Sequence, residues 1–305
     1  MHGMTEAAEQ RRIIVTGASG FVGRNVIRDA THEDGITTLP VVRSKAKAQE
    51  CAFSRWIHFE DLASGVSAAE FAGVPIIHLV GSARDQDRSP MWDANVRTTE
   101  CVVRAARLMG ASRIVLLSGY GIDLESSDAY FRARATAEAL IRESSVPFTI
   151  IRSSYVLGPG DELTPYLIDG LRGGRLELPG DGRCRIQPIY INDMSRILIR
   201  SALVKSTESV QDTVLGRAIS LRDYVNLIAG RMGAQATIEE VPLTLFMRRA
   251  VMNRDPDFTL TELAILVSEL LSAASDSYVG VKIRAIEETL HEWIPSGTGK
   301  GAATV

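Results

Sequence analysis

Short apolar runs rich in β-branched residues alternate with amphipathic stretches through the first half of the chain. The runs lie at Arg12–Thr16, Thr37–Arg43, Trp56–Phe59, Pro75–Val80, Arg113–Ser118 and Pro147–Arg152. Between most of them, apolar residues recur at helical spacing, as in Val22, Val26, Ile27 and Ala30. Apolar strands that alternate with helices are typical of a parallel sheet covered by helices on both faces. The pattern predicts an α/β fold with a doubly wound parallel sheet.

This rhythm changes after Arg152, where glycine and proline become frequent between residues 158 and 182. A last apolar run at Gln187–Ile191 precedes a helix near Asp193–Leu203, and Ser220 with Asp223 forms a capping box for a helix that reaches about Met232. Further helices are predicted at Leu243–Met252, Leu260–Ala273 and Tyr278–Trp293. We therefore predict a nucleotide-binding domain at 11–157, to which 183–205 returns. A smaller, mainly helical substrate region is expected at 158–182 and 206–294.

The composition excludes several classes of protein. The chain has 305 residues and a net charge of -3, so no basic surface favours nucleic acid or an anionic membrane. The apolar stretch Leu260–Ala274 contains two glutamates, which argues against a membrane span. Three cysteines suit a reducing compartment, and no side-chain spacing suggests a metal. We expect a cytoplasmic protein with a disordered head at 1–10 and a disordered tail at 295–305.

A glycine-rich segment lies between the first strand and the first helix. Gly17, Gly20 and Gly23 are spaced GxxGxxG. Glycine lets the backbone approach a pyrophosphate, and the following helix directs its free N–H groups at the anion. At the first strand–helix junction of a doubly wound sheet, this spacing predicts a dinucleotide site at the carboxyl ends of the strands. A tight turn that binds no ligand is the alternative.

The end of the second strand bears on the choice of cofactor. It reads Val41-Val42-Arg43-Ser44-Lys45, without an acidic side chain for the ribose hydroxyls. Glu33 and Asp34 precede this strand and lie at its wrong end. Because Arg43 can hold a 2′-phosphate with help from Ser44 and nearby lysines, NADP(H) is favoured and NAD(H) stays open. A solvated loop face is the other reading of these cations.

Motifs spread over nearly the whole chain resemble the extended and atypical short-chain dehydrogenase/reductases, which have a Rossmann-type fold. The motifs are Thr16-Gly-Ala-Ser-Gly-Phe-Val-Gly23, Glu60-Asp-Leu62, His78-Leu-Val-Gly81, Asn95-Val-Arg-Thr98, Leu117-Ser118, Tyr130 with Glu138, Ile151-Arg-Ser-Ser-Tyr-Val-Leu-Gly158 and Gln187-Pro-Ile-Tyr-Ile-Asn-Asp193. The cofactor-binding residues that this resemblance implies are Gly17, Ser19, Gly20, Phe21, Val22, Gly23, Arg43, Ser44, Asp61, Leu62, Val80, Gly81, Ser82, Asn95, Ser153, Ser154 and Val156. In the family, Asp61 and Leu62 would flank the adenine, and Ser153, Ser154 and Val156 would approach the nicotinamide.

The resemblance also points to a branch within the family. Leu178-Pro-Gly-Asp-Gly182 followed by Gln187-Pro188-Ile189 resembles the atypical branch that includes an accessory subunit of mitochondrial complex I and NmrA-like proteins. Sugar-nucleotide epimerases usually carry Arg-Asp-Phe where this chain has Ile186-Gln187-Pro188. This difference weakens the expectation of a sugar-nucleotide substrate.

The same resemblance implies a catalytic group. The family uses a tyrosine as general acid/base, a lysine four residues later and a serine at the preceding strand end. Tyr130 and Ser118 match two of these positions, but the third is Arg134. An arginine can polarise a phenol and hold a ribose hydroxyl, although it cannot pass on a proton as lysine can. Tyr120 and Tyr155 are alternative acids, and a tyrosine with no catalytic duty is the alternative role for Tyr130.

Two function classes follow from these residues. The first is an oxidoreductase that transfers hydride between NADP(H) and a carbonyl or alcohol carbon of a small molecule, with an epimerase or dehydratase as a close variant. The second is an NADP(H)-binding sensor or assembly factor without turnover. We expect His78 to be a packed core residue, Asp193 to cap a helix, and Glu138 with Arg142 to form a solvated pair. The resemblance also implies that a homodimer is possible, through the helices Ala94–Met109 and Tyr130–Ser144, although burial in the core is the other explanation of their apolar residues.

Overall fold

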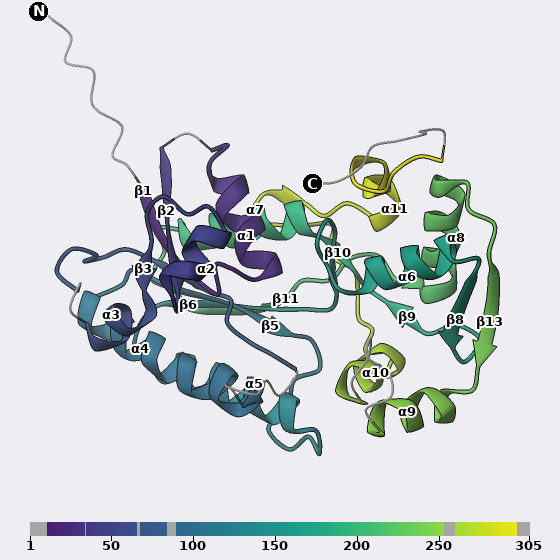
Figure 1. Cartoon of the computed structure of the whole chain (residues 1–305). Helices are drawn as coiled ribbons and strands as arrows, with labels where there is room; N and C mark the ends of the chain where they lie inside the picture. The colour runs from purple at the N-terminus through teal and green to yellow at the C-terminus, as the bar shows by residue number, and fades with distance from the viewer. Residues whose placement is uncertain (1–10, 34, 66–67, 84–89, 253–259, 298–305) are drawn as a thin grey trace, which may run out of the picture.

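Seven parallel strands form the central sheet (Figure 1). The computed structural model describes residues 11–33, 35–65, 68–83, 90–252 and 260–297, so the predicted head and most of the predicted tail lie outside the described residues. The strands are β1 (Arg11–Thr16), β2 (Ile36–Val42), β3 (Ile57–His58), β4 (Ile76–His78), β5 (Ile114–Gly119), β6 (Phe148–Ser153) and β11 (Val210–Thr213). Their order across the sheet is β11-β6-β5-β4-β1-β2-β3. This is the doubly wound parallel sheet that the apolar runs predicted, with the Rossmann-type fold that the family resemblance implied.

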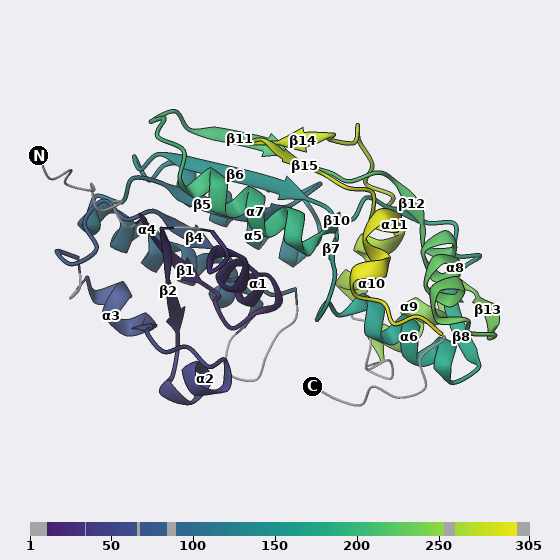
Figure 2. The ribbon, with the colours of Figure 1, turned by 90° about the horizontal axis from the view of Figure 1, so that it is seen from above.

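Helices cover both faces of the sheet, as the two views show (Figures 1 and 2). The helices α1 (Phe21–Ala30) and α7 (Ile191–Ala202) pack on one face. The other face carries α3 (Phe59–Ser64), α4 (Thr98–Met109) and α5 (Ala129–Arg142). A short helix, α2 (Lys45–Glu50), follows β2, and a π-helical turn at Asp93–Arg97 precedes α4. Strand residues such as Ile13 and Ile14 are completely buried, one in each of the two hydrophobic cores.

A smaller lobe stands beside the carboxyl ends of β5 and β6 (Figure 1). Its helices are α6 (Leu163–Arg172), α8 (Leu221–Met232), α9 (Leu243–Val251) and α10 (Leu260–Val267). Short strand pairs join them: β7 (Val156–Leu157) with β10 (Ile189–Tyr190), β8 (Arg175–Pro179) with β13 (Thr237–Val241), and β9 (Arg185–Ile186) with β12 (Ile219–Ser220). The N-cap of α8 is confirmed at Ser220, because the Asp223 backbone N–H donates to Ser220 Oγ over 3.0 Å. A third hydrophobic core, centred on Leu167 and Tyr224, fills this lobe.

One strand of the main sheet lies where the sequence predicted the smaller region. β11 belongs to residues 206–294, yet it pairs in parallel with β6 from Val210–Thr149 to Thr213–Arg152. Its residues alternate between half-buried and exposed because it is an edge strand. It therefore lacks the continuous apolar run that marks the inner strands. The part of the chain that returns to the main sheet therefore includes β11 as well as the predicted residues 183–205.

The helix predicted at Tyr278–Trp293 is wrong in its first half. The chain forms a hairpin of β14 (Ser277–Tyr278) and β15 (Val281–Lys282), followed by α11 (Ile286–Thr289) and a 3₁₀ turn at Leu290–Glu292. Val279 and Gly280 both have positive φ, 43° and 74°, which turns the chain in two residues. Val281, Ile283 and Ala285 are then buried in alternation, which is the period of a strand.

The expected role of Asp193 is also wrong. The helix α7 begins after Tyr190 and no side chain caps it. Asp193 is 1% exposed, and its two carboxylate oxygens accept from Nε and Nη2 of Arg284 over 2.8–3.2 Å. The Arg284 backbone N–H adds a further bond of 3.0 Å. Asp193 therefore ties the helix to the strand-like segment after β15, a contact between residues 91 positions apart.

Candidate active site

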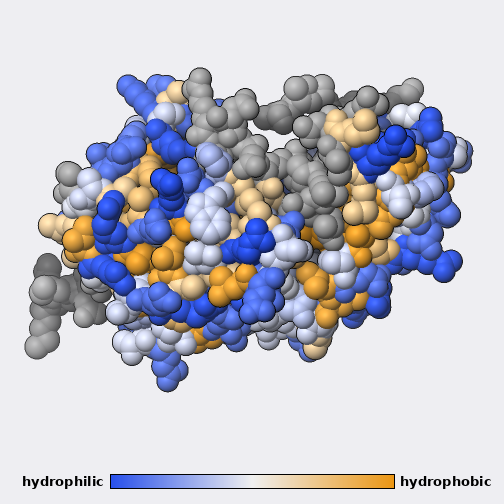
Figure 3. Space-filling view, turned by 90° about the horizontal axis from the view of Figure 1, so that it is seen from below, coloured by the Kyte–Doolittle hydropathy of each residue, from blue (hydrophilic) through white to orange (hydrophobic). Residues whose placement is uncertain are grey.

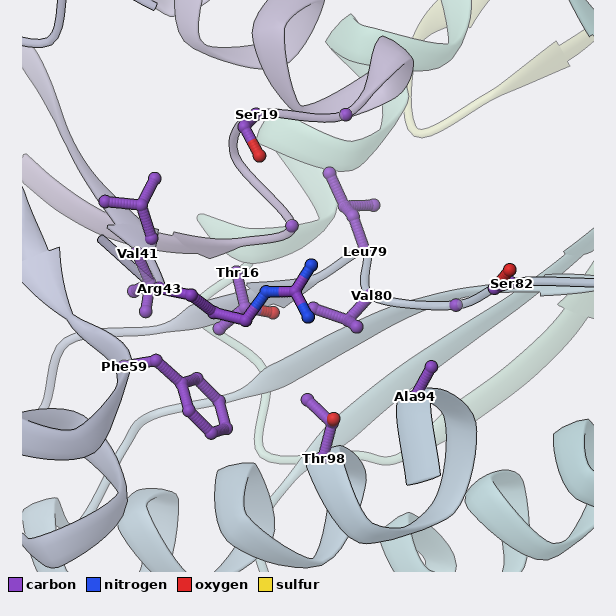
Figure 4. A pocket seen from close by; sticks show the side chains of 14 residues that line it. Thr16, Ser19, Val41, Arg43, Phe59, Leu79, Val80, Ser82, Ala94 and Thr98 are labelled. Atoms are coloured by element: carbon purple, nitrogen blue, oxygen red, sulfur yellow. The ribbon is translucent and has the colours of Figure 1, made fainter. Parts of the chain in front are cut away.

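A cavity of about 270 Å³ opens at the carboxyl ends of β1, β2 and β4 (Figure 4). The chain leaves β1 toward β2 and β3, and later returns to β4 on the other side of β1. Ligands of open α/β sheets bind at this kind of reversal in strand order. The lining residues are Thr16, Gly17, Ser19, Gly20, Val41, Val42, Arg43, Phe59, Leu79, Val80, Gly81, Ser82, Ala94 and Thr98. Seven of them were predicted: Gly17, Ser19, Gly20, Arg43, Val80, Gly81 and Ser82.

The glycine-rich loop packs too closely for side chains. Gly17 has φ of +70°, and a Cβ there would lie 2.7 Å from the carbonyl carbon of Leu79. A Cβ on Gly23 would lie 2.2 Å from the carbonyl oxygen of Gly17. Both neighbours are backbone atoms, so neither position can take a side chain without moving the chain. The loop thereby brings the start of α1 and the end of β4 to the same cavity.

The N-terminus of α1 is available to an anion. Its cap is Gly20, whose lack of a side chain leaves the first-turn N–H groups without a side-chain acceptor. No acidic residue lies in the first turn. The helix therefore directs free donors and its partial positive charge toward the cavity, as a pyrophosphate requires.

Arg43 is the cation of this cavity. Its side chain is exposed and extends across the opening toward Val80 (Figure 4). Among the described residues it has no ion-pair or hydrogen-bond partner. Its neighbours are already engaged, since Ser44 Oγ caps α2 by accepting the Lys47 N–H over 3.2 Å and Lys47 pairs with Glu50 over 2.7 Å. Among the described residues that line the cavity, Arg43 is the cation that could receive a phosphate.

The third strand contributes a residue that the motifs did not indicate. Phe59, the first residue after β3, lines the cavity with its ring (Figure 4). The predicted adenine neighbours do not line it: Asp61 is exposed in the first turn of α3, and Leu62 is 2% exposed in the core beneath the sheet. The position of Phe59 in the sequence could have indicated this role, because a residue directly after a parallel strand lies at the edge of the sheet where ligands bind. Thr16, Val41, Val42 and Leu79, at the ends of β1, β2 and β4, were missed for the same reason. Ala94 and Thr98 were also missed, and they line the cavity from the π-helical turn and from the first residue of α4.

A second pocket of about 130 Å³ lies at the carboxyl ends of β5 and β6. Since β5 is the neighbour of β4, both cavities occupy the same edge of the sheet. The lining residues are Gly119, Tyr120, Tyr130, Phe131, Ser153, Ser154, Tyr155, Arg185, Ile186, Ile265 and Leu270. Tyr130 and both alternative tyrosines therefore meet in one pocket, with predicted Ser153 and Ser154.

Ser118 does not line this pocket. Its Oγ donates to Oε1 of Glu138 over 2.7 Å, and the serine is 5% exposed. Glu138 is completely buried and also accepts from Arg142 over 2.7 Å and from Arg152 over 2.5 and 2.9 Å. The expectation of a solvated Glu138–Arg142 pair is therefore wrong, because Arg152 on β6 and Ser118 on β5 enclose the carboxylate. The bond with Glu138 also raises the pKa of the Arg152 guanidinium.

Ser153 lines the pocket and has a buried hydroxyl. It is 4% exposed, and its Oγ has no hydrogen-bond partner among the described residues. In the sheet it pairs with Gly119, so the two residues project from the same face. The Tyr120 backbone N–H donates to the Ser153 carbonyl over 2.8 Å, which fixes this corner. Gly119 has no side chain, so at this position of the two strands the hydroxyl of Ser153 is the side-chain polar group.

Arg134 lies against the segment that follows β4 and lines the first cavity. It is 4% exposed and donates to the carbonyl oxygens of Val80 and Leu117 and to Oδ1 of Asn95. A Cβ on Gly81 would lie 2.9 Å from Arg134 Nη1. Asn95 donates to the Ser82 and Met91 carbonyls, each over 2.8 Å. Arg134 and Asn95 therefore hold the segment after β4 in place, and neither is among the residues that line the two cavities described above.

His78 is a core residue, as predicted. It is completely buried between Thr16 Oγ1 at 2.7 Å and Thr99 Oγ1 at 3.0 Å. The Thr99 hydroxyl donates to the Asn95 carbonyl, so the bonding pattern assigns the ring proton to Nε2 of His78. Burial, with a smaller contribution from Arg134, lowers the pKa of His78 to about 3. The neutral ring links β1 to the buried end of α4.

The other predicted cofactor residues have packing roles in this structure. Phe21 and Val22 lie in the first turn of α1 and pack toward the core of the smaller lobe. Val156 lies in β7 and packs between that core and the sheet. Within the described ranges, no group of three or more His, Cys, Asp or Glu side chains could hold a metal. No helix in those ranges is long and apolar enough to cross a membrane.

Comparison with known proteins indicates the class of protein that has this fold and this cavity. Residues 17–168 match the family model described as NAD(P)H-binding. The chain is 26% identical over 260 residues to a 4-hydroxy-2-methyl-3-oxo-4-farnesyl-3,4-dihydroquinoline-1-oxide ketoreductase of Stigmatella aurantiaca, covering 76% of this chain and 76% of the relative. It is 26% identical over 258 residues to a 2-alkyl-3-oxoalkanoate reductase of Stenotrophomonas maltophilia, covering 73% of this chain and 76% of the relative. A solved nucleoside-diphosphate-sugar epimerase from Staphylococcus aureus shares the fold with a TM-score of 0.69 and 19% identity, over 92% of this chain and 99% of that one.

The fold and the glycine-loop cavity define a Rossmann-type protein that binds a nicotinamide dinucleotide. The chain belongs to the extended short-chain dehydrogenase/reductase and NmrA-like family, whose members include NAD(P)-dependent reductases and epimerases. This confirms the family that the motifs indicated.

Proposed function

We propose that this protein is an NAD(P)(H)-dependent oxidoreductase that acts on a carbonyl or alcohol carbon of a small molecule. One observation carries the proposal. The glycine-loop cavity and the Tyr130 pocket lie at the ends of neighbouring strands, on one edge of the sheet. A dinucleotide in the first cavity would therefore extend toward a substrate in the second. The ketoreductase and alkanoate reductase among the relatives support carbonyl reduction.

The residues of the first cavity fit an NADP(H) molecule. Gly17 and Gly23 leave the space that a pyrophosphate needs, and the uncapped start of α1 supplies donors. Phe59 offers a flat apolar surface for the adenine. Arg43, which is without a partner among the described residues, would hold the 2′-phosphate with its planar fork. NADP(H) is thus the preferred cofactor, with NAD(H) as the alternative.

Tyr130 is the proposed general acid/base. It lines the substrate pocket from the first turn of α5, where the Tyr130 backbone N–H donates to Oδ1 of Asp128 over 2.8 Å. A bound nicotinamide would supply or accept the hydride. Tyr130 would give a proton to the substrate oxygen during reduction and remove one during oxidation. Ser153, rather than Ser118, would hold that oxygen, because the Ser118 hydroxyl is engaged by Glu138.

Arg134 has a positioning role in this proposal. It lies one helical turn after Tyr130, on the same side of α5. Its donors bind the carbonyls after β4 and in β5, so it holds the floor of the cofactor cavity. A lysine has a single nitrogen and could not reach both carbonyls and Asn95 with the same planar geometry.

Cofactor binding and turnover test the proposal directly. We expect calorimetry to show tight NADPH binding that weakens about 10- to 100-fold in Arg43→Ala, whereas NADH binding changes little. The exposed Arg97→Ala is the matched control, because Arg97 pairs with Asp93 on the surface. Tyr130→Phe should keep NADPH affinity and lose carbonyl reduction. Failure of the wild-type protein to bind either nucleotide would overturn the proposal.

A second candidate function is an NADP(H)-binding sensor or assembly factor. The observation that favours it is the engagement of Arg134 and Ser118 by protein groups, which leaves Tyr130 as the sole member of the predicted catalytic group that lines the pocket. One relative, 22% identical over 245 residues, is a photosystem II assembly factor of Cyanophora paradoxa. For a sensor, Tyr130→Phe would leave cellular function intact, whereas Gly23→Ala would abolish it.

The homodimer stays a prediction. The helices α4 and α5 form much of one face of the molecule, on which apolar patches are interspersed with polar ones (Figure 3). Leu108 on α4 is 57% exposed, and Val102 and Val103 of the same helix are buried in the core. Core packing therefore accounts for most of the apolar density of α4. The mass in solution, by light scattering, would decide between one copy and two.

A further inference from the structure

The lining of the second pocket indicates what kind of molecule it accepts. Aromatic and aliphatic side chains form most of its wall, and its hydroxyls come from Ser153, Ser154 and three tyrosines. Ile186, Ile265 and Leu270 form the side contributed by the smaller lobe, of which Ile186 is 3% exposed. A wall of this kind stabilises an apolar body in proportion to the area removed from water.

Leu270 is held tightly against the end of the sheet. A Cβ on Gly121 would lie 2.4 Å from Leu270 Cδ1, so the leucine packs directly on the turn after β5. The chain around Leu270 is anchored two residues later, at Ser272. Gln187 Nε2 donates to the Ser272 carbonyl over 2.9 Å, and the Ser272 N–H donates to Gln187 Oε1 over 2.8 Å. Gln187 therefore clamps this wall with both ends of its amide.

The clamp itself is buried. Gln187 is 1% exposed, and Nε2 also donates to the Gly216 carbonyl over 3.1 Å. Both polar atoms of the side chain are thus satisfied by backbone groups. A buried amide with all these bonds formed holds one conformation, since leaving them unmade is costly. Gln187 therefore holds the apolar wall in one position.

The charges at the pocket do not suit a diphosphate. Arg185 is the cation among the described lining residues. The Glu269 carboxylate accepts its backbone N–H over 3.1 Å and lies 3.9 Å from its guanidinium. An anionic ligand would meet that carboxylate as well as the cation, so the attraction is largely cancelled.

We infer that the substrate is a carbonyl compound with an apolar chain or ring, and that Gln187 positions the wall that recognises it. This inference rests on the proposed function and specifies its substrate class. The substrate carbonyl lies at Tyr130 and Ser153, and its apolar body contacts Ile186, Ile265 and Leu270. Uridine diphosphate sugars are excluded from the pocket by the same wall.

A series of 3-oxo esters tests the inference. The probes are ethyl acetoacetate, ethyl 3-oxohexanoate and ethyl 3-oxooctanoate, with UDP-glucose and UDP-glucuronic acid as polar comparisons. We expect kcat/KM for NADPH oxidation to rise about fourfold for each methylene that becomes buried. With the UDP-sugars, the rate of NADPH oxidation should show no saturation. The inference would be overturned by a UDP-sugar whose KM is lower than that of ethyl 3-oxooctanoate. It would also be overturned if kcat/KM did not depend on the length of the ester chain.

Variants of the wall separate its role from general stability. In Leu270→Ala and Gln187→Leu, kcat/KM should hardly change as methylenes are added to the ester. Both variants should raise KM more than they lower kcat. The controls are Leu227→Ala, on an exposed face of α8, and Gln235→Leu, at an exposed position. NADPH affinity, which depends on the other cavity, should be unchanged in all four variants and reports that each is folded. Wild-type chain-length dependence in both Leu270→Ala and Gln187→Leu would contradict the assignment.

Binding measured without turnover keeps the two proposals distinguishable. Calorimetry with the same esters and NADP⁺ gives an affinity that needs no hydride transfer. Binding that depends on chain length, with no NADPH oxidation, would contradict the proposed reductase activity and support the apolar pocket. Turnover that does not depend on chain length would support the reductase activity and contradict the apolar pocket.

Discussion

The Ser118 hydroxyl donates to the Glu138 carboxylate over 2.7 Å, beneath the pocket rather than into it. The bond joins the end of β5 to the middle of α5, and two arginines complete the enclosure of the carboxylate. The serine that the motif assigns to the substrate is therefore part of a buried ionic cluster. Ser153, on the neighbouring strand, has the hydroxyl without a partner among the described residues.

Replacing each serine in turn by alanine should separate the role of Ser153 from that of Ser118. Ser153→Ala is expected to lower kcat for ester reduction about 10²-fold, because it removes a donor to the developing oxyanion. Ser118→Ala should leave kcat within about threefold and lower the melting temperature instead, since it breaks a buried bond. Steady-state kinetics with ethyl 3-oxohexanoate and thermal unfolding measure both. The reverse order of effects on kcat would return the catalytic role to Ser118.

The cluster around Glu138 should contribute strongly to stability. Glu138→Gln removes the charge that two guanidinium groups share, and the glutamate is completely buried. We expect a loss of about 3 kcal/mol in the free energy of unfolding, because breaking one side of a buried ion pair leaves the other side uncompensated. Urea titration gives the value. Asp93→Asn is the control, since the exposed Asp93–Arg97 pair should contribute less than about 1 kcal/mol.

The glycine loop allows a matched pair of substitutions. Gly23→Ala places a Cβ 2.2 Å from the Gly17 carbonyl oxygen, so it should destabilise the fold by about 1–3 kcal/mol and weaken NADPH binding. Gly230→Ala, in the exposed part of α8, meets no atom within 4 Å. It should stabilise the protein by up to about 1 kcal/mol, because alanine is the better helix former. Equal effects of the two changes on NADPH affinity would argue against a ligand at the loop.

The buried histidine predicts a pH dependence of stability. Unfolded histidine binds a proton below about pH 6.5. His78 in the folded protein has a pKa of about 3, so it stays neutral until much lower pH. The unfolded state then gains protons first, and His78 should lower the free energy of unfolding as pH falls from about 6.5 toward 3, by about 1.4 kcal/mol per pH unit.

His78→Gln provides the comparison, because the amide can bond to Thr16 and Thr99 but does not titrate. Urea unfolding of both proteins at pH 7, 6 and 5 measures the two slopes. From pH 7 to pH 5 the free energy of unfolding of the wild type should fall by about 2 kcal/mol more than that of the variant, with most of the difference arising below pH 6. Parallel slopes would mean that the histidine gains a proton in the folded state.

The sequence by itself determined the features that depend on local chemistry. Apolar runs such as Arg113–Ser118 predicted the inner strands because both faces of a parallel sheet are buried. Gly17, Gly20 and Gly23 predicted the loop because only glycine permits such close packing of the backbone. Ser220 and Asp223 predicted the start of α8 because the capping bonds form within four residues.

The tertiary structure alone decided which side chains face each other. The carboxylate of Glu138 is buried because Ser118 and Arg152 reach it from two other elements, which helical spacing cannot reveal. The edge strand β11 lacks an apolar run because only half of it is covered. Phe59 reaches the cavity because parallel strands end together at one edge of the sheet. These are contacts between distant parts of the chain, and their free energy depends on burial and geometry that exist only in the folded protein.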